Sequence, residues 1–353
     1  MHPPSILMIK AARAAVREAI LMNRYLSAAT AAAALFALAP GAASACACGC
    51  GIFDVGAGTF MPNNANSGLE LWFRIAELDQ NQNWAGSSKA PASDNSDKQI
   101  RTTFYFVGGQ YVVNRQWTVM AELPVYDRTF RSTDDGTVFG AEGSLYKAHD
   151  FAAGDLTLMA TYTGLAKDMS TGIGFGVKLP TGDDKGPAGP LGGREFDRDT
   201  VPGTGSTDLI VSGYHVGALN RTGSFGYFVD GRYQFAVATE GGYRPGNELD
   251  TALGVSYDLG NWGPLSRIAP VLQLVNSYRL HDTGANADPL NSGYERVLID
   301  PGLSVRIRKL RLNADVALPV YQHVNAAASP AVEGTSGQLV TKASFRFQAT
   351  YDF

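Results

Sequence analysis

The chain is poor in cysteine. It has three in 353 residues, all in the stretch CACGC, at Cys46, Cys48 and Cys50. A fold held together by scattered disulfides is therefore excluded, and there is no C-x-x-C motif of the zinc or redox type. Thiol chemistry is confined to one short segment near the N-terminus.

Histidine is scarce too, with five in the chain. None belongs to an H-x-S arrangement that would place a nucleophile and its base on one strand face, and H-E-x-x-H and C-x-x-C-H are absent. We therefore expect a protein that is not an enzyme. We predict His149, His281 and His323 in or near external loops and His215 in a strand.

Basic residues do not predominate: 29 Lys and Arg stand against 33 Asp and Glu, which gives a net charge of −4 at pH 7. Binding to nucleic acid requires a basic footprint, so nucleic acid is not an expected partner.

A long apolar run occurs only near the N-terminus, at residues 25–45. It follows Arg24 and ends in the small-x-small signal ASA, which is typical of a secretory signal peptide cleaved between Ala45 and Cys46. A membrane anchor is the alternative, but Pro40 interrupts the run before it reaches the length that crosses a bilayer.

The predicted organisation has three parts. Residues 1–45 form the signal peptide, for which Met22 is a second candidate start. Residues 46–66 form a periplasmic or lumenal segment, and residues 67–353 form a single domain of strands.

Twelve segments of this domain alternate apolar and polar side chains with the period of two that strands require. In FGYFVDGRYQFAV (225–237), aromatic and aliphatic side chains share one face, and Asp230 and Arg232 share the other. Such segments predict a transmembrane antiparallel barrel. They run approximately over 67–78, 99–113, 116–127, 154–164, 171–180, 206–218, 225–237, 248–259, 266–280, 294–307, 310–322 and 339–353.

The connections alternate between short turns and mostly longer, Gly- and Asp-rich loops. This alternation predicts an all-β, up-and-down, 12-stranded barrel in the bacterial outer membrane, with both termini and the short turns periplasmic. Pro124, Pro180 and Pro319 lie near the predicted outer ends of strands, where they either end the strand or mark bulges.

The last residues, FRFQATYDF, place aromatic side chains on one face and finish on Phe353. This ending resembles the C-terminal signal by which bacterial outer-membrane barrels are recognised. We therefore expect Tyr351 and Phe353 to address the chain to the barrel assembly machinery.

The polar faces of the segments predict the lining of the lumen. Charges of both signs occur there, so the residues either pair and brace the lumen or line a solute path. TGIGFGVKLP (171–180) directs three glycines inward, leaving room for a ligand or for packing. The predicted lumen residues are Glu70, Arg74, Glu122, Lys178, Asp230, Arg232, Glu248, Asp250, Arg279, Asp300, Arg306, Arg311 and Asp315.

Residues 46–66 are apolar enough that we expect them to fold into the barrel as a plug. Three interpretations of Cys46, Cys48 and Cys50 stay open: a strained disulfide with a spare thiol, lipidation of Cys46, and a three-sulfur site for Cu or Zn. No other cofactor is expected.

Acidic clusters occur in three predicted external loops, RSTDDG, TGDDKG and REFDRD. None matches a calcium-binding loop, and solvated acidic loops are the default interpretation. The alternative is that they bridge lipopolysaccharide through cations. The expected surroundings are outer-membrane lipid and lipopolysaccharide.

Several stretches carry a resemblance across nearly the whole chain from Cys46 onwards: ELPVYDR, KLPTGD, FDRDTVPGTGSTDL, YRPGNELD, NADPLNSGYER and LPVYQHVN. They resemble proteobacterial outer-membrane proteins of the phenol meta-pathway transporter family, several of which begin with an ACACGCG-type segment. The second strand departs slightly, reading KQIRTTF where the family has DIRTTF. The resemblance implies an outer-membrane barrel that admits hydrophobic or aromatic solutes.

Three functions follow in order of preference. The first is an outer-membrane channel for small, hydrophobic or aromatic solutes. The second is an envelope protein that binds Cu or Zn through its cysteine segment, and the third is a barrel enzyme.

Overall fold

The computed structural model describes residues 68–134, 136, 138–326 and 337–353. The predicted signal peptide, the segment 46–66 and its three cysteines lie outside these residues. No helix among the described residues is both long and apolar enough to cross a membrane.

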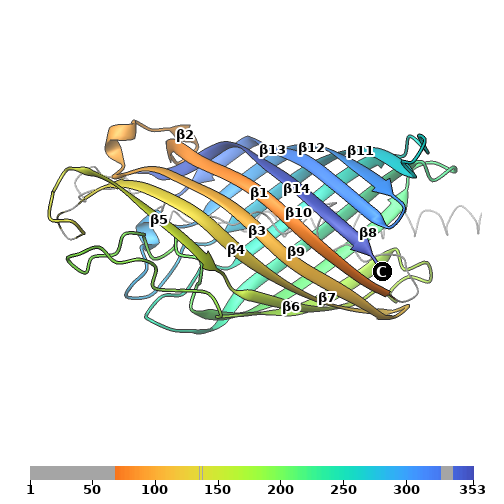
Figure 1. The fold of residues 1–353 in the computed structure, drawn as a ribbon, viewed down its shortest axis with the longest axis horizontal. Helices are drawn as coiled ribbons and strands as arrows, with labels where there is room; N and C mark the ends of the chain where they lie inside the picture. The colour runs from red at the N-terminus through yellow and green to blue at the C-terminus, as the bar shows by residue number, and fades with distance from the viewer. Residues whose placement is uncertain (1–67, 135, 137, 327–336) are drawn as a thin grey trace, which may run out of the picture. The chain divides into compact units, whose positions relative to one another are not determined.

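Twelve antiparallel wall strands close into a barrel, each pairing with its neighbours in the sequence, and β14 pairs with β1 (Figure 1). The predicted fold class is thereby confirmed. β5 and β6 are two parts of one wall strand, because both pair with β4, and β2 is a short extension paired with β1. The elements are β1 (Gly68–Ala85), β2 (Ser88–Lys89), η1 (Ala92–Asp94), β3 (Asp97–Asn114), β4 (Trp117–Thr133), β5 (Leu145–Ala153), β6 (Leu156–Tyr162), β7 (Thr171–Leu179), β8 (Ser206–Ala218), β9 (Phe225–Thr239), β10 (Glu248–Tyr257), β11 (Arg267–Arg279), η2 (Pro289–Asn291), β12 (Tyr294–Ile307), β13 (Leu310–Val324) and β14 (Gln338–Asp352).

Nine of the twelve wall strands have bounds within two residues of the predicted segments, and β8 and β12 match them. The prediction is wrong at three outer ends: β1 continues to Ala85 and β4 to Thr133, and β5, with His149, is a strand where the pattern predicts a loop. The reason is chemical: Lys147 and His149 are polar on the outward face of β5, so the apolar alternation stops there although the strand continues. β4 extends to Thr133 for the same reason.

The outer surface of the barrel is apolar, and the inner surface is rich in polar side chains. Outward residues such as Val107, Phe175 and Leu253 are about half exposed, whereas many inward polar side chains are buried. An exposed apolar band on a closed barrel is the surface that lipid requires.

Barrel closure uses the C-terminal strand. Tyr351 pairs with Leu71 in the register of β1 and β14, and the Phe353 amide donates to the Leu69 carbonyl over 2.9 Å. The Tyr351 and Phe353 rings pack edge to face at 4.9 Å on the outside. Their recognition by assembly machinery stays a prediction.

The prolines divide between the two predicted roles. Pro180 directly follows β7 and ends it, whereas Pro124 lies within β4, opposite the break between β5 and β6. Gly154 at this break donates its amide to the Pro124 carbonyl over 2.8 Å. Pro319 lies within β13, beside a register shift. The break between β5 and β6 matters most, because it positions Asp155.

One glycine on the inner wall makes room for a tryptophan side chain that crosses it. Trp72, Gly108 and Glu122 lie in register on β1, β3 and β4, and the Trp72 indole crosses Gly108 to donate to Glu122 over 2.7 Å. A Cβ at Gly108 would lie 2.3 Å from the indole ring. Only glycine allows this close approach.

We expect Gly108→Ala to destabilise the barrel by about 1–3 kcal/mol, because the indole must leave a packed position and lose its carboxylate partner. The measurement is the temperature at which heat-modifiable gel migration is lost. Gly213→Ala is the matched control, since a Cβ there comes no closer to another atom than 3.6 Å. Equal melting of the two variants would contradict the packing argument.

Candidate functional site

Several of the predicted lumen charges are buried in ion pairs on the inner wall. Arg346, which is not among the predicted lumen residues, joins Asp300 and Asp315 and lies among buried polar side chains. The polar faces could have revealed it, because Arg346 alternates with the outward aromatics of β14. Other pairs are Arg74–Glu122 at 3.1 Å, Arg311–Glu70 at 2.8 Å and Arg306–Asp352 at 3.2 Å.

The loop between β7 and β8, residues 180–205, is tied to the wall at the break between β5 and β6. Asp155 accepts hydrogen bonds from the amides of Gly182 and Thr204, each over 3.0 Å, and from the Thr204 hydroxyl over 2.6 Å. Gly154, Gly182 and Gly203 lie so close that a Cβ on Gly203 would come within 2.4 Å of Gly182. One carboxylate therefore holds both ends of the 180–205 loop.

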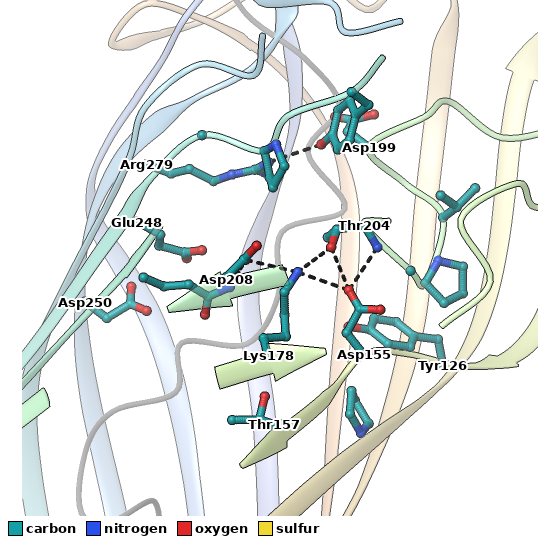
Figure 2. Close-up of a pocket in the computed structure, with 18 of the residues that line it drawn as sticks. Tyr126, Asp155, Thr157, Lys178, Asp199, Thr204, Asp208, Glu248, Asp250 and Arg279 are labelled. Atoms are coloured by element: carbon teal, nitrogen blue, oxygen red, sulfur yellow. Dashed lines mark hydrogen bonds and ion pairs between the residues drawn. The ribbon is translucent and has the colours of Figure 1, made fainter. Parts of the chain in front are cut away.

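Lys178 neutralises this carboxylate. Its Nζ lies 3.0 Å from both Asp155 and Asp208 and also donates to Thr204, and the three charged side chains are at most 9% exposed (Figure 2). Buried charges need partners and hydrogen bonds of this kind. Lys178 comes from β7, Asp208 from β8 and Asp155 from the strand break, so the cluster depends on three parts of the wall.

The 180–205 loop also packs on an apolar cluster inside the barrel. Phe196 is 2% exposed and stacks on Phe130 of β4 at 5.4 Å. The buried Arg128 donates to the Thr200 carbonyl of the loop and to the Thr102 hydroxyl. The loop is therefore part of the folded interior.

A second polar chain joins this loop to the opposite wall. The guanidinium of Arg198 lies 4.3 Å from the centre of the Tyr243 ring, and the Tyr243 hydroxyl donates to Asp282 over 2.8 Å. Arg279 pairs with Asp282 at 2.5 Å. Burial lowers the pKa of Arg198, and burial beside Asp282 raises the pKa of Tyr243 well above its usual value, so the phenol stays a donor.

Between these two groups lies a cavity of about 170 Å³ (Figure 2). An apolar cavity of about 150 Å³ holds benzene, so this space suits a solute of one ring. Its lining combines aromatic and apolar surface with charges of both signs. The residues that matter here are Phe106, Glu122, Tyr126, Asp155, Thr157, Lys178, Arg198, Asp208, Arg232, Glu248, Asp250, Arg279 and Tyr294.

Six of the predicted lumen residues meet at this cavity: Glu122, Lys178, Arg232, Glu248, Asp250 and Arg279. Glu70, Arg74, Asp230, Asp300 and Arg306 do not line it. Two further lining residues, Asp155 and Arg198, are absent from the predicted set. Asp155 is the second residue of the predicted segment 154–164, where the pattern gives no sign of the strand break, and Arg198 lies outside the alternating segments. No local pattern shows that a loop folds back onto the wall.

The three inward glycines of β7 serve packing. A Cβ at Gly172 would meet the Tyr214 ring at 2.3 Å, and one at Gly176 would meet Met159 at 2.6 Å. Neighbouring side chains already fill the recess, so these glycines do not form the cavity.

Comparison with known proteins identifies the architecture. No family model and no curated protein sequence matches the chain. Among solved structures, it is similar to an outer membrane channel from Pseudomonas putida F1, with a TM-score of 0.59, 13% identity, and coverage of 85% of this chain and 99% of that one. The β domain of the Bordetella autotransporter BrkA has a TM-score of 0.44 and 12% identity, with coverage of 81% of this chain and 100% of that one. The monoaromatic hydrocarbon channel CymD has a TM-score of 0.38 and 11% identity, with coverage of 89% of this chain and 94% of that one. At 13% identity the first of these structures shows a shared fold and no more, and that fold is an outer-membrane β-barrel.

We expect Lys178→Met to release the 180–205 loop, because it leaves two buried carboxylates without their cation, a loss of about 3–5 kcal/mol. Limited digestion of the detergent-solubilised protein with proteinase K should then cut this loop many times faster than in the native chain. Lys185→Met is the matched control, since it removes the same charge from an exposed position of the same loop. A Lys178→Met protein as resistant as the control would show that the cluster does not hold the loop.

Proposed function

We propose that this protein is an outer-membrane channel that passes small solutes of about one ring in size. The observation that carries the proposal is the 170 Å³ cavity between the inner wall and the 180–205 loop. A 12-stranded barrel is too narrow for the wide aqueous pore of a 16-stranded porin, so a loop folded inside it sets the width of the path.

The lining supports a solute with both an aromatic and a polar part. Tyr126, Tyr294 and Phe106 offer ring faces and edges, and Lys178 and Arg232 lie beside Glu248 and Asp250. Most charges are already paired, so passage does not require a strongly charged solute. A phenol or a hydroxybenzoate has the size and the mixed chemistry of this lining, in agreement with the resemblance to the phenol meta-pathway transporters.

The apolar outer band supports a position in the outer membrane, with lipid around the barrel. The short turns lie at the end of the barrel where β1 begins and β14 ends. Short turns are periplasmic in barrels of this class, so the proposal places both termini in the periplasm and the long loops outside. The alternative role in Cu or Zn handling rests on Cys46, Cys48 and Cys50 alone.

Purified full-length protein in liposomes should admit arabinose and 4-hydroxybenzoate, but not a trisaccharide, in swelling assays. Thr157→Trp should slow both several-fold, because this buried residue of β6 lines the cavity. Leu158→Trp should have no effect, because the next residue on the same strand faces outward and is 37% exposed.

Heat-modifiable migration of both variants establishes that their barrels are closed. If neither solute enters faster than in protein-free liposomes, the channel proposal fails. If Thr157→Trp and Leu158→Trp behave alike, the cavity is not on the path.

A further inference from the structure

On β1, β3, β4 and β5, the outward side chains are apolar up to one row of paired residues and mostly polar beyond it. Ile75, Tyr105, Val125 and Ala153 pair in sequence across β1, β3, β4 and β5 and form the last wholly apolar row there. Beyond this row the same four strands continue, with side chains such as Thr103, which pairs with Glu77 and Asp127. This taller part of the wall therefore presents a mostly polar face beside the lipid-facing band, with Phe151 and Leu145 as its exposed apolar side chains.

Three cations gather on this face. Arg131 of β4 and Lys147 of β5 are directly opposite each other in the antiparallel register, and both are exposed. Arg101 of β3 is opposite Thr129, which places it diagonally from Arg131 on the same face and within reach of its long side chain. Like charges in directly opposed positions repel, so the barrel alone is destabilised by this arrangement.

Three acids lie on the same face as these cations. Asp79 is directly opposite Arg101 in the register of β1 and β3 and accepts a hydrogen bond from Gln99 over 2.8 Å. Asp127 pairs with His149 at 2.8 Å, and Glu77 is opposite Thr103. Within the described part of the chain, no hydrogen bond or ion pair engages Arg101, Arg131 or Lys147. Arg131 is opposite Gln99 and Lys147 in the register, with no acid in that row, so this row has a place for an anion from outside the described part of the chain.

We propose that Arg101, Arg131 and Lys147 form a binding site for the phosphate groups of an outer-leaflet glycolipid of the lipid A type. Two guanidinium forks and an ammonium match phosphate oxygens in geometry and charge. The site lies just beyond the apolar band, where the headgroups of surrounding lipid stand, and long basic side chains extend to that level from a wall. The proposal relies on the outer-membrane placement, but not on the transport of any solute.

The probe is bisphosphorylated lipid A, titrated onto the full-length protein in detergent micelles and counted by native mass spectrometry. The native chain should retain it, and Arg101→Gln/Arg131→Gln/Lys147→Gln should bind it at least tenfold more weakly, at roughly one factor of five per lost cation. Dephosphorylated lipid A should bind equally weakly to both proteins. Liposome swelling by the triple variant should equal that of the native chain.

The matched control is Arg221→Gln/Arg308→Gln/Lys309→Gln, which removes the same net charge from turns at the opposite end of the barrel. It should retain lipid A as the native chain does. Equal retention of bisphosphorylated lipid A by the two triple variants would overturn the proposal. The proposal would also fail if the native chain retained dephosphorylated lipid A as well as the bisphosphorylated form, because phosphate would then play no part. It would also be overturned if the three residues held a second copy of the chain, seen as a dimer in lipid-free micelles that the first triple variant abolishes.

Discussion

Every backbone amide and carbonyl of a chain in lipid must find a partner within the protein, and the rest of this structure depends on that constraint. Pairing of β14 with β1 satisfies it for most of the wall. The exception is local: β7 ends at Leu179, and within the described residues β5 pairs only with β4. The 180–205 loop lies where the regular ladder stops, and Asp155 at the strand break fixes both of its ends.

The interior therefore combines two kinds of stabilisation. Apolar clusters such as Phe130 with Phe196 hold the loop by burial, while Lys178 and its carboxylates give it one position. A buried ion cluster contributes little net stability, but it strongly disfavours arrangements in which any member loses its partners. For the proposed channel this matters, because the width of the path would depend on where that one loop lies.

The two faces of each strand lie in different surroundings, one inside the barrel and one on its outer surface. Inward charges are paired inside the barrel, as Arg346 is with Asp300 and Asp315. Outward charges occur on the tall part of the wall beyond the apolar band, and there Arg131 and Lys147 face each other without an acid between them. The same alternation of side chains thus separates the polar interior of the barrel from its outer, apolar surface.

The sequence by itself determined the barrel, its strand number and most of its strand bounds, because a period of two is a local property that lipid on one face makes visible. The outer ends of β1 and β4 and the whole of β5 escaped it, because their outward side chains are mostly polar. It also indicated which charges lie on the polar faces, including Glu122, Lys178 and Arg279. Only the tertiary structure decided that Asp155 and Arg198 join them, that β5 is a strand, and that the glycines of β7 serve packing. These outcomes depend on contacts between segments far apart in the chain, such as Gly154 with Gly203, which no local periodicity records.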